Sequence, residues 1–309
     1  MKRFAVLSVI SLFTLGHADT PTSESPYYVN PDTQVREWVE ANPDDEKASA
    51  LERIANQPTA NWVGDWTEDI EAEVAAYTNA AEAVGKIPVL VAYNIPGRDC
   101  GNFSSGGAGN PEAYQEWISD FATGLEERQA IIILEPDALP LLPDCEEIAD
   151  EGITYDLLSY AVDTFAELAP NAQVYIDAGN AAWLAPEEVA TRLQNAGVER
   201  AAGFALNTSN YHSTEKSEAY GDEVVAAIGA PTRFVVDSSR NGVGAPPDDE
   251  WCNPAGRKIG ETPRSVKGDT GLEHVLWVKR PGESDGDCGV GEGTNAGEFM
   301  PEAAFDMTQ

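Results

Sequence analysis

The sequence predicts an α/β fold in which a parallel sheet closes into a barrel. Short apolar, β-rich runs alternate with amphipathic helical stretches, and this βαβα order is typical of parallel sheets. A length of 309 residues suits a closed barrel better than an open sheet. Nearly every apolar run ends in a polar side chain, and the carboxyl ends of barrel strands are where functional groups collect. We therefore expect a site at this rim.

The expected strands are six apolar runs and a short seventh strand around Trp62 and Val63. The six runs are 87–93, 130–134, 173–176, 203–206, 233–236 and 274–278. Helical periodicity is clearest in 68–84, 111–127, 153–168 and 186–196. Because no internal repeat or linker is visible, we expect residues 19–309 to form one domain.

The first 18 residues have the pattern of a secretory signal peptide. Lys2 and Arg3 precede an apolar stretch too short to span a bilayer, and Gly16, His17 and Ala18 form a small-residue cleavage site. This pattern predicts a secreted, extracellular protein with no membrane partner. Four cysteines fit an oxidising compartment, where they can form two disulfides with three possible pairings.

The composition is strongly acidic. A net charge of −34, from 53 acidic and 19 basic residues, argues against a nucleic acid partner, since phosphate neutralisation needs Lys and Arg. It favours an uncharged substrate and resembles the composition of proteins adapted to high salt. With three histidines and no CxxC spacing, we expect no metal site, and we expect no cofactor.

Three carboxylates follow apolar runs next to turn-forming residues. They are Asp99, Asp137 and Asp285, and tryptophans lie near them in the sequence. Cleavage of a glycosidic bond needs one protonated carboxyl group and a second carboxylate that assists a water or attacks the sugar. A single such Asp often serves as a helix cap or turn former. Repetition of the pattern at six strand ends favours a catalytic rim.

Seven motifs together resemble the family 6 glycoside hydrolases, which are inverting cellulases. They are YNIPGRDC (93–100), ILEPDAL (133–139), YIDAGNAAW (175–183), NTSNY (207–211), DSSRNG (237–242), EWCNP (250–254) and WVKRPGESDG (277–286). The resemblance extends from about Tyr27 to Met307. It implies a distorted, incomplete parallel β/α barrel of about seven strands, with the cleft at the C-terminal ends of the strands.

The resemblance also implies catalytic roles. Asp137 matches the general acid, and Asp99 matches a neighbour that raises the pKa of Asp137 and orders the attacking water. Asp285 matches the residue proposed as the base. The alternative is a water that passes its proton along a chain involving Ser105, Tyr93 and Asp99.

Other positions match the substrate-binding groups and disulfides of the family. Asp177 is expected to bind substrate and to tune the acid cluster. Asn180 stands where the family often has His, so it can bond a sugar hydroxyl but cannot titrate. The implied disulfides are Cys100–Cys145 and Cys252–Cys288.

Four tryptophans match sugar subsites of the family, because indoles complement the apolar faces of sugars. They are Trp62, Trp183, Trp251 and Trp277, and core packing is the alternative for each. Lys279 and Glu283 are expected to bond a glucosyl unit, unless they pair with each other. Asn210 is expected to bond a hydroxyl, unless it only forms a turn.

Loop length distinguishes enzymes that cut within a chain from those that cut at its ends. Cys288 comes three residues after Asp285, and only 289–298 precede Phe299, which is too little chain to cover a tunnel. We therefore expect an open cleft and an endo-β-1,4-glucanase acting on cellulose. Separately, we expect the protein to be a monomer. The alternatives are a cellobiohydrolase, a mixed-linkage β-glucanase and a non-catalytic β-glucan-binding protein.

Overall fold

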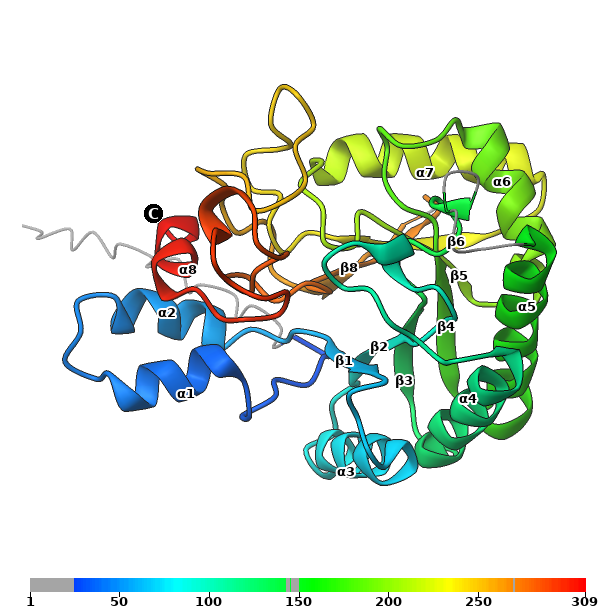
Figure 1. Ribbon diagram of the computed structural model, residues 1–309, viewed down its shortest axis with the longest axis horizontal. Helices are drawn as coiled ribbons and strands as arrows, with labels where there is room; N and C mark the ends of the chain where they lie inside the picture. Colours follow the sequence, from blue (N-terminus) through cyan, green and yellow to red (C-terminus); the bar gives the residue numbers. More distant parts are fainter. Residues whose placement is uncertain (1–24, 143–144, 146–149, 269) are drawn as a thin grey trace, which may run out of the picture.

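The computed structural model describes residues 25–142, 145, 150–268 and 270–309, and its centre is a single curved sheet (Figure 1). The strand order is β1-β2-β3-β4-β5-β6-β8-β7. The strands are β1 (Asn61–Gly64), β2 (Val89–Tyr93), β3 (Ala130–Leu134), β4 (Ala172–Asp177), β5 (Gly203–Leu206), β6 (Arg233–Asp237), β7 (Arg264–Ser265) and β8 (Leu272–Leu276). The proposed signal peptide, residues 1–18, lies outside the described residues.

The sheet is an incomplete barrel, as the family resemblance implied, whereas the described strands do not form the closed barrel expected from the chain length. Pairing is parallel from β1 through β6 to β8, which gives the seven parallel strands, and the short β7 joins β8 in antiparallel fashion. In the described chain no ladder joins β1 to β8. Single bonds link the two ends instead, from the Ala60 N–H to the Trp277 carbonyl at 2.9 Å and from Trp62 Nε1 to the Val278 carbonyl at 2.9 Å.

Helices cover the outer face of the sheet (Figure 1). The covering helices are α3 (Ile70–Ala83), α4 (Pro111–Leu125), α5 (Glu151–Leu168), α6 (Pro186–Asn195) and α7 (Thr214–Ile228). The helices α1 (Gln34–Ala41), α2 (Ala48–Ala55) and α8 (Pro301–Met307) pack together in a separate group. The side chains of Asp69, Asn110, Asp150 and Ser213 accept backbone N–H bonds at the starts of α3, α4, α5 and α7. No described helix is long and apolar enough to cross a membrane.

The strands are buried on both faces, which explains their continuous apolar sequences. In β3, Ile131 and Ile133 point into the barrel, whereas Ile132 and Leu134 pack under the helices. A third apolar cluster lies between α1, α2 and α8, which the sequence did not predict as helices. This cluster attaches the N-terminal helices to the open side of the barrel.

The last parallel strand differs from its expected bounds. β8 covers Leu272–Leu276, not 274–278. After Leu276 the chain leaves the ladder because the buried carboxylate of Asp237 accepts the N–H groups of Val278, at 3.2 Å, and Lys279, at 2.9 Å. A side chain thus replaces the backbone partner and turns the chain toward the rim.

Candidate active site

A cavity of about 810 Å³ opens at the carboxyl ends of the strands. It brings together most of the residues expected from the sequence. These are Trp62, Tyr93, Asp99, Ser105, Asp137, Asn180, Trp183, Asn210, Trp251, Lys279, Glu283 and Asp285. Two expected residues, Asp177 and Trp277, are not among the residues that line it.

Asp137 lies three residues beyond β3 in a left-handed backbone conformation, with φ of 68°. Its N–H donates to Asp177 Oδ1 at 3.0 Å. Burial raises the pKa of Asp137 well above its usual range, and the charges of Asp177, Asp99 and Asp285 raise it further. A carboxyl group in this setting holds its proton at a pH where an ordinary Asp is ionised.

Asp177 is fully buried at the end of β4, which corrects the expectation that it contacts substrate. Its Oδ1 accepts the N–H groups of Asp137 and Gly179, each at 3.0 Å. Burial raises the pKa of Asp177 to about 6, and the charge of Asp237 adds to the rise. Its geometry agrees with the other expected role, which is to tune the acid beside it.

Asp99 lies in the loop after β2, also with a left-handed φ of 58°. Its Oδ2 accepts the Ser104 N–H at 2.6 Å, which folds the loop back toward the rim. Burial raises the pKa of Asp99, although the Ser104 N–H and the Arg98 charge oppose the rise. The Cys100–Cys145 disulfide, expected from the resemblance, anchors this loop and is confirmed.

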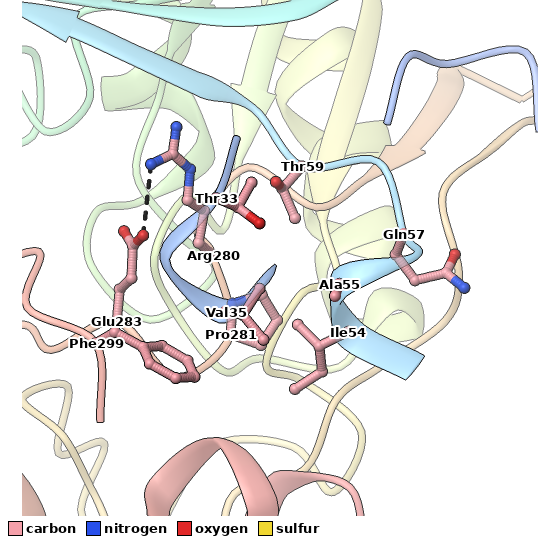
Figure 2. A pocket seen from close by; sticks show the side chains of 10 residues that line it. All are labelled: Thr33, Val35, Ile54, Ala55, Gln57, Thr59, Arg280, Pro281, Glu283 and Phe299. Carbon is pink, nitrogen blue, oxygen red and sulfur yellow. Dashed lines mark hydrogen bonds and ion pairs between the residues drawn. The ribbon is translucent and has the colours of Figure 1, made fainter. Parts of the chain in front are cut away.

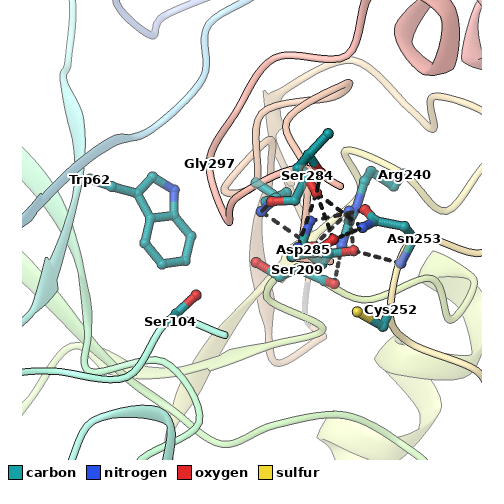
Figure 3. A network of polar contacts seen from close by, with 12 residues as sticks. Trp62, Ser104, Ser209, Arg240, Cys252, Asn253, Ser284, Asp285 and Gly297 are labelled. Carbon is teal, nitrogen blue, oxygen red and sulfur yellow. Dashed lines mark hydrogen bonds and ion pairs between the residues drawn. The ribbon is translucent and has the colours of Figure 1, made fainter. Parts of the chain in front are cut away.

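Asp285 lies in a dense polar network (Figure 3). Arg240 Nη1 donates to both carboxylate oxygens, at 3.0 and 2.9 Å, and Lys279 Nζ is 3.2 Å from Oδ1. Tyr211 and the Asn253 N–H donate to Oδ2. Burial alone would raise the pKa of Asp285, but the charges of Arg240 and Lys279 outweigh it and hold the pKa below its usual range. Asp285 is therefore an anion near neutral pH.

Asn253 holds the backbone of the same loop. Its Oδ1 accepts the Asp285 N–H at 2.9 Å, and its Nδ2 donates to the Gly286 carbonyl at 2.9 Å. The neighbouring Cys252–Cys288 disulfide is the expected pairing and is confirmed. Figure 3 shows Trp62 and Ser104 apart from the residues of this network.

Lys279 and Glu283 do not pair with each other in the described contacts. Lys279 bonds Asp285 and the Ser284 carbonyl, whereas Glu283 bonds Gln34 Nε2 at 2.9 Å and Arg280 at 3.4 Å. Behind Glu283 lies a cavity of about 10 Å³, walled by side chains such as Thr59 (Figure 2). It has room for about one water and none for a sugar.

The expected aromatic platforms divide into two groups. Trp183 and Trp251 are 38% and 46% exposed in the cavity, and Trp62 is half-buried with its ring edge-on to Tyr93. Trp277 is 1% exposed and packs in the apolar cluster of α1 and α2, so its assignment to a sugar subsite is wrong. Side chains alternate along a strand, and since Leu276 points into the barrel, Trp277 points outward.

Several lining residues were missed by the sequence reasoning. They include Gln34, Trp66, Arg98, Phe103, Thr208 and His212. Trp66 carried a signal, since it follows the expected Trp62 by four positions and lies just beyond the end of β1. Gln34 carried none, because α1 reaches the cavity only through tertiary packing. Among the described residues no group of three or more His, Cys, Asp or Glu side chains could hold a metal ion.

Comparison with known proteins agrees with this geometry. Residues 19–308 match the model of "Glycosyl hydrolases family 6". The chain belongs to glycoside hydrolase family 6. The resemblance noted in the sequence is thereby confirmed, and the protein is a glycoside hydrolase of the cellulase family.

Similar members of family 6 are bacterial endoglucanases. Endoglucanase 1 of Streptomyces halstedii is 46% identical over 94% of this chain and 90% of its own length. Endoglucanase A of Cellulomonas fimi is also 46% identical, over 94% of this chain, which spans 62% of that protein. A solved structure is also similar, that of the endoglucanase Cel6 from Mycobacterium tuberculosis in complex with a thio-linked cellobioside. It superimposes with a TM-score of 0.86 at 40% identity, and the match covers 93% of this chain and 97% of that chain.

Proposed function

We propose that this enzyme hydrolyses internal β-1,4-glucosidic bonds of cellulose and related β-glucans with inversion of configuration. The observation that carries the proposal is the position of Asp137 in the cavity wall with Asp99 and Asp285, where burial and the charges of Asp177, Asp99 and Asp285 raise its pKa. Inverting hydrolysis needs an acid for the leaving oxygen and a separate route for the proton of the attacking water.

Asp137 is the general acid of this proposal. Its raised pKa keeps a proton available near neutral pH, and its place in the cavity wall gives it access to a glycosidic oxygen. Its backbone N–H bond to the buried Asp177 fixes its position, since Asp177 is anchored at the end of β4.

Asp285 is a poor candidate for the base. Its oxygens accept bonds from Arg240, Lys279, Tyr211 and Asn253, and the two cations lower its affinity for a proton. Its fixed negative charge instead suits stabilisation of the positive charge that develops on the sugar in the transition state.

Asp99 is the more basic of the two carboxylates, because burial raises its pKa whereas the net shift of Asp285 is downward. We therefore favour the second route for the attacking water. In that route Ser105, which lines the cavity in the same loop, relays the proton toward Asp99. Tyr93 lines the same cavity as Ser105 and Asp99 and is the third residue of this proton-transfer chain.

A neutral glucan fits the remaining lining groups. Trp62, Trp183 and Trp251 provide flat apolar surfaces for pyranose rings, and the N–H edges of Trp183 and Trp251 can bond hydroxyls. Lys279, Glu283, Asn180 and Asn210 add further hydrogen-bonding groups around the same space. These residues are the proposed substrate-binding set.

Endo action is supported by the similar endoglucanases and by the short segment after Asp285. The loop after Asp99 nevertheless reaches the chain segments of Gly286 and Trp251. Phe103, in the loop after Asp99, lies against Gly286, and its ring centroid is 6.4 Å from that of Trp251. One side chain therefore spans the cleft, whereas a tunnel needs longer loops.

Secretion is part of the proposal. The two disulfides require an oxidising compartment. The family match also begins at residue 19, directly after the proposed signal peptide. Both observations support a catalytic domain that is exported and acts outside the cell.

Two measurements test the proposed function. Polarimetry during cellopentaose hydrolysis should show α-configured products first, because inversion converts a β-linkage into an α-anomer. The viscosity of carboxymethyl-cellulose should fall well before much reducing sugar appears. A β-anomer would refute inversion, and reducing sugar without a viscosity drop would indicate a cellobiohydrolase. No hydrolysis at all would indicate a binding protein, and a rate confined to mixed-linkage glucan would change the substrate.

A further inference from the structure

Trp66 is the most exposed tryptophan of the described chain. It lies in the loop between β1 and α3, is 55% exposed and lines the same cavity as the acids. Trp183 and Trp251, which the proposed function already uses, are less exposed at 38% and 46%. A large aromatic surface left in water is unfavourable, so its exposure inside a binding cleft needs an explanation.

The indole of Trp66 is held rigidly from behind. The guanidinium carbon of Arg98 lies 5.1 Å from the ring centroid. Arg98 is 5% exposed and cannot move freely, because it bonds Asp65 at 2.9 Å, the Tyr93 carbonyl at 2.9 Å and the Ser104 carbonyl at 2.8 Å. One face of the ring therefore rests on a fixed cation.

Gly64 provides the space for the edge of the ring. A Cβ atom at this position would lie 2.5 and 2.6 Å from two carbons of the Trp66 side chain, which is closer than real contacts allow. The last residue of β1 is thus small where the indole passes over it. Both contacts leave the flat ring fixed, with the exposed part of its surface available to the cavity.

We propose that Trp66 is a stacking platform for a further glucosyl unit of the substrate, in addition to Trp62, Trp183 and Trp251. The inference rests on the proposed function, since the ligand is the same β-glucan. A pyranose ring presents an apolar face of C–H bonds that complements an indole, and a ring fixed in advance loses little conformational entropy on binding. Trp66 then sets how many sugar units the cleft engages.

The competing explanation is that Trp66 only covers Arg98. Arg98 also donates to the Ser105 carbonyl at 3.3 Å, so it holds the loop of Ser104 and Ser105 in place. Loss of the cover could loosen that loop and weaken binding indirectly. Asp65→Asn is a matched control for this route, because it removes the ion pair of Arg98 and leaves the indole present.

The test measures cellohexaose affinity by calorimetry in an Asp137→Asn background, which slows turnover. Trp66→Leu keeps an apolar cover over Arg98 but removes the flat ring, and it should weaken binding roughly tenfold. Trp66→Phe should retain part of the affinity because a phenyl ring can still stack. Asp65→Asn should bind close to the parent, and the melting temperatures of both Trp66 variants should match that of the parent.

Three results would overturn the platform. They are parental affinity in Trp66→Leu, an equal loss in Trp66→Leu and Trp66→Phe, and a loss of the same size in Asp65→Asn. Failure of the proposed function gives a different result, because the parent itself would then not bind cellohexaose.

Discussion

Arg240 and Asp285 form a buried ion pair in which one guanidinium nitrogen donates to both carboxylate oxygens, at 3.0 and 2.9 Å. Their side chains are 1% and 6% exposed. The pair joins the chain after β6 to the loop after β8, and the Arg240 guanidinium also lies over the Tyr211 ring, 4.4 Å from its centroid. It fixes both the position of Asp285 and its charge.

Arg240→Gln should therefore destabilise the fold strongly. Removing one partner of a buried pair leaves an uncompensated charge and typically costs about 3–5 kcal/mol, measurable by urea unfolding. The matched control is Arg264→Gln, whose pair with Glu261 is 47% exposed on both sides and should cost about 0–1 kcal/mol. Similar losses of stability in the two variants would show that the buried pair of Arg240 contributes no more than an exposed pair.

The cost of Arg240→Gln should also depend on pH. The pKa of Asp285 is lowered in the folded protein, so its pairing stabilises the fold fully above the ordinary value of 3.8. This contribution is lost as pH falls through the lower folded pKa. The difference in free energy of unfolding between wild type and variant should thus shrink on acidification. A difference that grows would mean that the pKa of Asp285 is raised in the folded protein, not lowered.

Asp137→Asn should remove most activity on cello-oligosaccharides but retain binding. The amide keeps the shape of the side chain but cannot supply the proton, and a general acid contributes about 10² to 10⁴-fold. Steady-state rates on cellopentaose measure the loss, with the exposed Asp120→Asn as a control that should keep wild-type rates. Substrates with good leaving groups should lose less, since they need less protonation. Wild-type turnover of unactivated oligosaccharides would show that another group is the acid.

Replacing a neighbouring carboxylate should shift the alkaline limb of the pH profile to lower pH. Asp177 and then Asp99 are the charges that raise the pKa of Asp137 most after burial. Asp177→Asn and Asp99→Ala should both lower that pKa, and Asp177→Asn should have the larger effect. The Asn amide can still accept the Asp137 N–H, so the geometry is kept. The measurement is kcat/KM against pH, and an unmoved limb in both variants would show that burial alone sets the pKa.

Phe103→Ala should make the enzyme cut more freely within the chain. The variant removes the side chain that contacts Gly286 and Trp251 across the cleft. We expect more viscosity loss per reducing end on carboxymethyl-cellulose, with little change in melting temperature because Phe103 is 48% exposed. Val290→Ala, 53% exposed and outside the cavity lining, is the control. An unchanged ratio would mean that Phe103 does not restrict entry.

Sodium chloride should raise the melting temperature. With 53 acidic and 19 basic residues, the folded chain repels itself at low ionic strength. Salt shortens the Debye length from about 30 Å at 0.01 M to about 3 Å at 1 M, which screens surface carboxylates. Calorimetry between about 0.05 and 2 M measures the effect. A flat or falling melting temperature would refute salt adaptation but would not affect the assignment of the protein as a glycosidase.

Much of the fold was predictable because it depends on local patterns. A short, β-branched run such as Ala130–Leu134 favours a buried strand, and an amphipathic stretch such as Pro111–Leu125 favours a helix that covers it. The bounds of β8 were not predictable, since they depend on Asp237, a side chain from the neighbouring strand. The helices α1 and α2 were missed because they are short and owe their stability to packing.

The sequence by itself determined the family, the order of the strands and the acids at their ends, because motifs and periodicity lie in contiguous residues. Only the tertiary structure decided which side chains face the cleft. Asp177 lies behind Asp137, Trp277 turns outward into the cluster of α1 and α2, and Trp66 faces the cavity. The physical reason is that the direction of a side chain follows from strand pairing and burial, and both depend on residues far away in the chain.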